Sequence, residues 1–331
     1  MIRLSYIIPC YNVEAFIAEC LDSLFAQDLS PDDYEVICVD DCSTDRTREI
    51  IQEFQRGHSN LRLLEQPRNL SQAAARNRAL DVAQGDYVWF IDSDDYLKTG
   101  SARLLLEHAE CNGLDILLFN FEEVREHGTE WLDRTDLFAP SPVLTGTDYI
   151  QQYFPGKLNR ISLVWLCLFR RRLLSENAIC FPPLHVSEDS IFLWKCLFHA
   201  ARVESVAHRG YIHRLNRQSI IQTPANFKRS FCRSFLFPKE MRTLVQAYAG
   251  RIPDPLIQEL QRYIRYETNQ FAMRYKQLGP DDRHRYFQAM AADREWFTLF
   301  KEGLSGRNKL VYFSSFAGEK VFDAAVRKIS H

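Results

Sequence analysis

Short apolar runs alternate with amphipathic segments along the N-terminal part of the chain. Runs rich in β-branched and aromatic residues predict buried strands, at residues 3–9, 35–39, 61–64 and 87–91. Between them, apolar residues recur at helical spacing, which predicts helices at residues 13–25, 45–55 and 71–84. Strands that alternate with helices form parallel sheets with right-handed crossovers, so the sequence predicts an α/β fold with a mostly parallel central sheet flanked by helices.

The rest of the chain divides into a mixed segment and a helical segment. In the mixed segment we expect helices at residues 101–111, 147–154, 163–177 and 187–200, strands at 115–121 and 203–215, and a loop or small hairpin at 122–142. Further on only helical spacing recurs, at residues 227–248, 256–277, 281–300 and 316–329. The sequence therefore predicts two domains, residues 1–225 and a helical C-terminal domain at 226–331.

The composition is that of an ordinary soluble protein, with 46% hydrophobic and 25% charged residues. No segment of the sequence reaches the roughly 18 uncharged apolar residues that a membrane-spanning helix needs. The N-terminus has the pattern of a first strand rather than a signal peptide, so we expect a cytoplasmic protein whose nine scattered cysteines are reduced thiols. Charge is uneven, because residues 226–331 hold 19 Lys and Arg against 11 Asp and Glu while the whole chain has a net charge of −2.

The strand predicted at residues 87–91 runs directly into four polar residues, Asp92, Ser93, Asp94 and Asp95. Alternate side chains of an extended segment share a face, so Asp92 and Asp94 can point at one target. Two carboxylates at that spacing repel each other unless a cation lies between them, and Mg²⁺ or Mn²⁺ carrying phosphate oxygens is a suitable cation. The alternative is a polar turn that follows a strand and caps the next helix.

Polar residues also follow two other predicted strands, at residues 9–12 and 40–43. Ligands of parallel sheets bind beyond the carboxyl ends of the strands, and all three polar clusters lie at that edge. The sequence therefore predicts one binding site rather than three unrelated turns. Within the first cluster we expect Pro9 to end the strand ladder and Asn12 to cap the following helix.

Five segments of the chain together resemble a known family. They are SYIIPCYN at 5–12, VDDCSTDRT at 39–47, ARNRAL at 75–80, GDYVWFIDSDD at 85–95 and SED at 187–189. In this order and spacing they resemble the motifs of family 2 glycosyltransferases, over about residues 1–220. The resemblance implies the GT-A fold, which is Rossmann-like, whereas the C-terminal helices match no motif of the family.

The resemblance also implies an activity. Family members use a nucleotide-sugar donor, usually a uridine diphosphate (UDP) sugar, with Mn²⁺ or Mg²⁺, and transfer the sugar with inversion at the anomeric carbon. We expect a hexosyl or N-acetylhexosaminyl transfer to a hydroxyl of a glycan or lipid-linked glycan, in the assembly of a bacterial surface polysaccharide or glycan. No nucleic-acid partner is expected.

The motifs of the family imply residues for the donor site. Pro9 and Tyr11 line the base pocket, Asp41 accepts a hydrogen bond from the uracil N3–H, and Arg76 lies near the nucleotide. Cys42 departs from the pattern, because glycine is more usual there, and its side chain is expected to narrow the pocket. Three further donor-site residues come from the same motifs: Asn12, Asp40 and Ser93.

The leaving diphosphate needs positive charge around it, from a metal and from basic groups that are already in place. The resemblance implies that Asp92 lies at the ribose or the metal and that Asp94 binds the metal directly. His213, Arg214 and Arg217 are candidates to close over the diphosphate. For His213 the alternative is an ordinary polar residue of a strand.

The acceptor hydroxyl must lose a proton as it attacks the sugar from the face opposite the leaving group, so a carboxylate base is needed. Glu188 and Asp189, at a predicted helix start, occupy the motif position for this role. We assign the base to Asp189 and the binding or orientation of the acceptor to Glu188, although the sequence leaves open which of the two is the base. Acidic residues are also favoured in the first turn of a helix, so capping alone is the alternative.

Two other functional classes share parts of this pattern. Phosphatases with an aspartyl nucleophile also have Asp-x-Asp after an apolar strand, but they need a small or hydroxyl residue at the position of Tyr96. A non-catalytic sugar-nucleotide-binding or assembly protein on the same fold would not need both the metal carboxylates and the Glu188–Asp189 pair.

The basic, aromatic C-terminal helices leave several roles open. They suit an ordinary buried layer, a peripheral contact with the inner face of the membrane, a homodimer contact or a site for an anionic acceptor.

Overall fold

The computed structural model describes residues 1–125, 131–133, 136–154, 163–183, 187–215, 225–275, 278–292, 299 and 318–328. The chain forms two compact units, Met1–Ser219 and Ile220–His331. The division into a nucleotide-sugar-binding catalytic domain at residues 1–225 and a helical C-terminal domain at 226–331 stays a prediction. Within the described ranges, no helix is long and apolar enough to cross a membrane.

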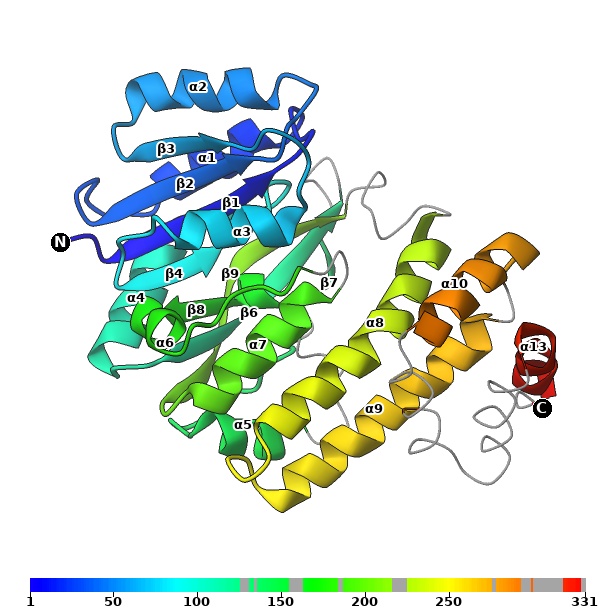
Figure 1. The fold of residues 1–331 in the computed structure, drawn as a ribbon. Coiled ribbons are helices and arrows are strands. Elements are labelled where there is room, and N and C mark those ends of the chain that lie inside the picture. The colour runs from blue at the N-terminus through cyan, green and yellow to red at the C-terminus, as the bar shows by residue number, and fades with distance from the viewer. Residues whose placement is uncertain are drawn as a thin grey trace. The chain divides into compact units, whose positions relative to one another are not determined.

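Unit 1 is built on a mixed sheet whose N-terminal strands are parallel (Figure 1). Over the described residues its nine strands follow the order β3-β2-β1-β4-β8-β6-β9-β5, with β7 beside β6. β8 lies antiparallel between β4 and β6, while β6 and β9 are parallel. The strands are β1 Leu4–Cys10, β2 Tyr34–Asp40, β3 Leu61–Glu65, β4 Tyr87–Phe90, β5 Tyr96–Leu97, β6 Ile116–Arg125, β7 Trp131–Asp133, β8 Cys167–Arg170 and β9 Val203–Leu215.

Helices cover the sheet and leave its central strands without solvent contact. β1 and β2 are buried along their whole length, as expected for parallel strands with helices on their faces. α3 packs on β1 and β2, and α4 packs on β6, β8 and β9 (Figure 1). The helices of this unit are α1 Ile17–Phe25, α2 Thr47–Gly57, α3 Gln72–Leu80, α4 Ser101–Cys111, α5 Gly146–Tyr153, α6 Arg171–Glu176 and α7 Glu188–His199, with a 3-10 turn, η2, at Val164–Leu166.

The helix predicted at residues 163–177 is wrong over its central part. Cys167–Arg170 forms β8, which is hydrogen-bonded to a strand on each side. A fully buried strand is apolar throughout, so periodicity alone does not separate it from a buried helix. The small hairpin expected within residues 122–142 is present where it is described, since β7 pairs with the end of β6.

Two predictions for the loop after β1 are wrong. Pro9 does not end the ladder, because β1 continues to Cys10 beside β2. The pairing of β1 with β4 ends at Ile7, so Pro9, which has no N–H to donate, lies beyond the last residue pair of that ladder. Asn12 does not cap α1, which begins at Ile17; with φ of 52° it lies in the left-handed region that asparagine tolerates.

Unit 2 is helical over its described residues, with α8 Ala225–Ala247, α9 Asp254–Tyr275, α10 Pro280–Ala292 and α13 Glu319–Lys328. α8 and α9 lie side by side. The aromatic residues of α9 divide between two faces, since Tyr263 and Phe271 are buried while Tyr266 is exposed beside Arg262 and Arg265. Part of the basic, aromatic pattern therefore belongs to an ordinary helical core, and the end of the helix predicted at residues 281–300 lies largely outside the described residues.

Candidate active site

The ends of β1, β2 and β4 bring the predicted polar clusters to one edge of the sheet. Cys10 is in register with Asp40, and β4 runs parallel to β1 on its other side. Four of the six non-glycine residues with positive φ in the described chain occupy loops of the predicted motifs or next to them: Asn12, Cys42, Ser71 and Ser187. Backbone conformations of this kind concentrate at functional sites, which supports a binding site at this edge.

Cys42 shows why a glycine is more usual at its position. Its φ of 66° lies in the left-handed region, which glycine adopts without steric cost. Its side chain is exposed and its thiol is free. The backbone conformation at this position therefore favours glycine. The expected narrowing of the nucleotide pocket by the Cys42 side chain stays a prediction.

Asp41 is held by three donors of the protein. Its Oδ1 accepts hydrogen bonds from Gln66 Nε2 at 2.9 Å and from the backbone N–H of Leu70 at 2.7 Å, and its Oδ2 accepts one from the N–H of Ser71 at 2.9 Å. Burial raises the pKa of Asp41, and the two backbone N–H groups oppose that rise. These three donors fix the position of the carboxylate, and its predicted contact with a uracil N–H stays a prediction.

The neighbouring residues of this edge brace the loops. Asn12 Oδ1 accepts a hydrogen bond from the backbone N–H of Thr44 at 2.8 Å, and the buried carboxylate of Asp40 accepts one from the N–H of Ser43. Both contacts join or tighten the loops after β1 and β2. Tyr11, two residues after Pro9, is 47% exposed, so it is accessible at the surface.

Arg76 links two of the predicted motifs. From α3, its Nη2 lies 2.8 Å from Asp92 Oδ1 and its Nη1 lies 2.5 Å from Asp189 Oδ1. Burial alone would lower the pKa of Arg76, but the charges of Asp189, Asp92 and Glu188 raise it, so the guanidinium stays protonated. The structure therefore brings the residues of the donor-side and acceptor-side motifs together at one buried cation.

Asp94 lies in an electrostatic environment set by burial and by neighbouring charges. Burial and the charge of Asp92 raise its pKa, while His213 and Arg214 act in the opposite direction. Hard divalent cations bind carboxylate oxygens, and a cation would relieve the repulsion between two neighbouring carboxylates. Asp94 and Asp92 are therefore suitable ligands for such a metal. The described part of the chain contains no group of three His, Cys, Asp or Glu side chains that could hold one, so further ligands would have to come from the substrate or from water.

Asp95 points into the protein rather than into the site. It accepts hydrogen bonds from Tyr211 Oη and from the backbone N–H of Arg214, both at 2.8 Å. Burial and the charges of Asp94 and Asp92 raise its pKa well above the ordinary value. The Tyr211 hydroxyl also accepts the N–H of Asp92 at 3.1 Å, so the buried pair of Tyr211 and Asp95 fixes the turn that carries the partly exposed Asp92 and Asp94. Ser93 is buried in the same turn.

Glu188 and Asp189 begin α7, as the sequence predicts. Their carboxylates make contacts with side chains of α3: Gln72 Nε2 donates to Glu188 Oε1 at 2.7 Å, and Arg76 holds Asp189. Glu188 is buried, while the Asp189 side chain is 20% exposed. Asp189 is therefore the more accessible of the two, and capping of α7 does not account for these contacts.

The three basic candidates have different positions. His213 stacks on Trp165 and lies 3.4 Å from Glu123 through Nδ1. Arg214 is buried, where it donates to Glu19 at 2.7 Å and to the backbone carbonyl of Asp94 at 3.0 Å. Arg214 thus binds the backbone of the turn that carries Asp94. Its closure over the diphosphate stays a prediction. Arg217 lies outside the described residues.

Sequence reasoning missed several residues that shape this site. Gln72 lies one helical turn before Arg76, so the spacing on α3 was a usable signal. Tyr211, Gln66 and Glu19 act through contacts between segments far apart in sequence, for which the chain offers no local signal.

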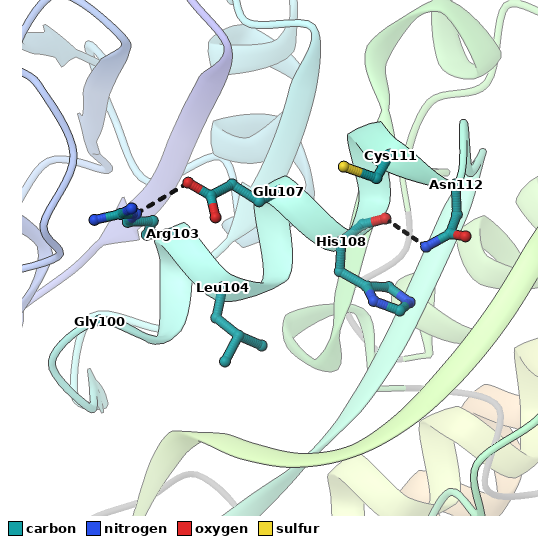
Figure 2. A pocket seen from close by; sticks show the side chains of 7 residues that line it. All are labelled: Gly100, Arg103, Leu104, Glu107, His108, Cys111 and Asn112. Atoms are coloured by element: carbon teal, nitrogen blue, oxygen red, sulfur yellow. Dashed lines mark hydrogen bonds and ion pairs between the residues drawn. The ribbon is translucent and has the colours of Figure 1, made fainter.

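A pocket of about 440 Å³ lies elsewhere on unit 1, along the exposed face of α4 (Figure 2). Arg103 and Glu107 pair within the helix, whereas His108 Nε2 lies 3.0 Å from Glu204 of β9. None of the predicted site residues lines it: the lining residues are Gly100, Arg103, Leu104, Glu107, His108, Cys111 and Asn112.

The fold is that of GT-A glycosyltransferases, which confirms the predicted fold class. The sequence profile described as Glycosyl transferase family 2 matches residues 5–177. The chain belongs to this family, which confirms the resemblance found in its motifs.

Two curated relatives illustrate the similarity. The chain is 34% identical to the uncharacterized glycosyltransferase EpsJ of Bacillus subtilis (strain 168) over 226 residues, which cover 66% of this chain and 63% of EpsJ. It is 31% identical to the poly(ribitol-phosphate) beta-N-acetylglucosaminyltransferase TarS of Staphylococcus aureus (strain Mu50) over 220 residues, which cover 66% of this chain and 36% of TarS. The chain thus spans less than two thirds of the length of these relatives.

Solved structures show the same fold at lower identity. The crystal structure of S. aureus TarS 1-349 in complex with UDP-GlcNAc has a TM-score of 0.64 and 20% identity, covering 99% of this chain and 91% of that one. The mannosyltransferase PcManGT of Pyrobaculum calidifontis, in complex with GDP-Man and Mn²⁺, has a TM-score of 0.56 and 18% identity, covering 98% and 86%.

Proposed function

We propose that this chain is an inverting glycosyltransferase that moves a sugar from a UDP-sugar to a hydroxyl group during synthesis of a bacterial cell-surface polymer. The observation that carries the proposal is the meeting of Asp92 and Asp189 at the guanidinium of Arg76, with Asp94 next to them. The strand-end carboxylates belong to the donor side and Asp189 to the acceptor side. A transfer between two substrates needs both sides within reach of one reacting carbon.

In this mechanism Asp189 is the general base. The acceptor oxygen attacks the anomeric carbon and its proton passes to the Asp189 carboxylate, while the bond between that carbon and the diphosphate oxygen breaks and UDP leaves with the bonding electrons. Glu188, held by Gln72, lies next to Asp189 and orients the acceptor. Attack from the face opposite the leaving group inverts the configuration of the sugar.

The donor assignment is supported by Asp41 and by one relative. Asp41 is a fixed acceptor for a uracil N–H, with Tyr11 accessible beside the same loops. TarS has been crystallised with UDP-GlcNAc, which favours a UDP-sugar over other nucleotide sugars here. The names of TarS and of a poly(ribitol-phosphate) beta-glucosyltransferase favour a hexosyl or N-acetylhexosaminyl group and a polymer hydroxyl as acceptor.

Asp94, with Asp92 as its neighbour, would hold the divalent cation, Mn²⁺ or Mg²⁺. When bound, the cation supplies positive charge that stabilises the leaving diphosphate. The Mn²⁺ of the PcManGT complex supports a divalent cation in this fold. A cytoplasmic location, contact of the C-terminal helices with the inner face of the membrane, and dimerisation through them stay predictions.

A screen of nucleotide sugars tests the function. The purified chain is incubated with Mn²⁺ and UDP-glucose, UDP-GlcNAc, UDP-galactose, UDP-GalNAc or GDP-mannose, and released nucleotide is measured with and without a poly(ribitol phosphate) acceptor. We expect slow release from a UDP-sugar alone and faster release with acceptor. Asp189→Asn should bind the donor normally in calorimetry and lose transfer by about 100-fold or more, the usual effect of removing a general base.

Asp22→Asn is the matched control, since Asp22 is an exposed carboxylate of α1. It should keep the wild-type rate. Donor binding without turnover of any sugar nucleotide would contradict the proposal and favour a non-catalytic sugar-nucleotide-binding protein.

A further inference from the structure

The guanidinium of Arg76 is a charged group that the protein has placed almost wholly inside unit 1. Its side chain is 1% exposed, and three carboxylates lie around it. Charges of this kind are buried only where partners neutralise them. The partners come from two different elements, since Asp92 follows β4 while Glu188 and Asp189 begin α7.

The two terminal nitrogens of Arg76 have separate partners. Nη1 lies 2.5 Å from Asp189 and 3.8 Å from Glu188, whereas Nη2 lies 2.8 Å from Asp92. The ring of Phe181 lies 5.3 Å from the guanidinium carbon. Nε is buried without a hydrogen-bond partner, so the guanidinium is accompanied by three carboxylates and one aromatic ring while one of its donors stays unsatisfied.

α3 holds both acidic residues of α7 at the same time. Gln72 donates to Glu188 and Arg76 binds Asp189, one turn further along α3. The residue before this pair, Ser187, has φ of 66°, and no side-chain hydrogen bond caps the helix there. The direction of the Asp189 carboxylate is therefore tied to α3 by the Arg76 contact.

We propose that Arg76 is a positioning residue that orients the general base, by holding Asp189 and Asp92 on the two arms of one guanidinium. This inference rests on the proposed function and assigns Arg76 a different task from nucleotide binding. A lysine cannot replace it, because an ammonium group is a single point of charge whereas the guanidinium presents a planar fork. The acceptor-side base and the donor-side carboxylate are thereby kept at a constant separation.

The first test separates orientation of the base from binding of the donor. Arg76→Lys keeps the charge and removes the fork, so we expect kcat for transfer to fall about 100-fold while the donor KM changes less than about threefold. Arg78→Gln is the control, because Arg78 lies on the same helix and bonds only to the Glu65 carbonyl among the contacts described. It should keep kcat within about twofold. A rise in donor KM at unchanged kcat in Arg76→Lys would overturn the proposal.

The second test is a double-mutant cycle of Arg76→Lys and Asp189→Asn, measured both in kcat and in the free energy of unfolding. If Arg76 acts through Asp189, the lysine variant costs less than about threefold in kcat once Asp189 is already Asn. The unfolding cycle must also show coupling, since it reports the contact itself in the absence of substrate. Additive effects in either cycle would overturn the role of Arg76.

The unfolding cycle also distinguishes the two proposals. If the unfolding cycle shows coupling between Arg76 and Asp189 but the wild-type chain turns over no sugar nucleotide, the proposed function is contradicted, and with it the catalytic task of Arg76. If the wild-type chain transfers sugar but the kcat cycle is additive, the proposed function stands and only the task of Arg76 is contradicted.

Discussion

Two groups of carboxylates follow parallel strands at the same sheet edge, and the protein surrounds them differently. In the loop after β2, Asp41 accepts three hydrogen bonds from the protein and Asp45 accepts two from backbone N–H groups. In the turn after β4, Asp92 accepts a hydrogen bond from the guanidinium of Arg76, which it shares with Asp189. Burial and the negative charge of Asp92 raise the pKa of Asp94. We call these the Asp41 region and the Asp94 region.

The difference matches two kinds of ligand. A carboxylate that must accept one N–H from a base works best when the protein already fixes its direction, as around Asp41. A carboxylate that must bind a cation needs oxygen lone pairs directed at the ligand, and repulsion from a neighbour makes the arrival of that cation more favourable. Under the proposed function, the Asp41 region is a fixed acceptor and the Asp94 region is a site that its ligand completes.

Replacing Asp94 gives the largest expected effect and tests this contrast most directly. In Asp94→Asn we expect sugar-nucleotide turnover with Mn²⁺ to fall about 1000-fold, because one charged ligand near the leaving group is removed. The free energy of unfolding in chelator should stay equal or rise, since the neutral amide removes the repulsion from Asp92 and the penalty for burying a charge. Released UDP and urea unfolding measure the two effects. A variant that is active with chelator present, or clearly less stable, would break the contrast.

Replacing Asp41 should have the opposite balance. In Asp41→Asn the amide NH₂ meets N–H donors, so at least one buried donor loses its acceptor and unfolding should become about 2–3 kcal/mol easier. Donor KM should rise about tenfold while kcat changes little, because the lost contact belongs to binding. Urea unfolding and steady-state kinetics measure these changes.

A graded variant sharpens the same comparison. Gln66→Ala removes one of the three donors to Asp41 and leaves both backbone donors, so its loss of stability should be less than half that of Asp41→Asn. Equal losses in the two variants would mean that the side chain of Gln66, rather than the fixed carboxylate, determines the stability of this loop.

The N-terminal half of the sheet could be predicted because its signals are local. Strands β1, β2 and β3 are each followed by a helix, so the parallel direction of the strands and the edge at their carboxyl ends follow from the sequence. The position of β8 did not follow, since a buried apolar segment becomes a strand only through pairing with β4 and β6 far along the chain.

The candidate site shows the same division between local and distant information. Asp41, Asp92 and Asp94 belong to polar clusters that could be found at the strand ends from the sequence, and the resemblance to the family implies their roles. The contact between Arg76 and Asp189 joins residues 113 positions apart, and that between Tyr211 and Asp95 joins residues 116 apart. No periodicity carries such contacts, so the shared guanidinium and the buried tyrosine could be seen only in three dimensions.

Asp45 gives the smallest expected effect and tests whether the Asp41 region is stabilised by its donors. Its Oδ2 accepts the N–H of Glu14 and its Oδ1 accepts that of Thr47, both at 3.0 Å. Burial would raise the pKa of Asp45, but these hydrogen bonds and the Thr47 hydroxyl bring it below the ordinary value. A carboxyl whose pKa is lower in the folded state adds stability above its unfolded pKa of about 3.9, and this stability is lost as the pH falls through the folded pKa.

Asp45→Asn should therefore cost about 1 kcal/mol of unfolding free energy at pH 7 and progressively less below about pH 4. Urea unfolding of the wild type and the variant at pH 7, 5 and 3.5 measures this difference, with Asp22→Asn as an exposed carboxylate that should show no such trend. A penalty that is the same at all three pH values would mean that the shape of the side chain, and not its charge, holds the loops after β1 and β2 together. The Asp41 region would then owe its rigidity to packing, and the contrast with the Asp94 region would rest on Asp41 alone.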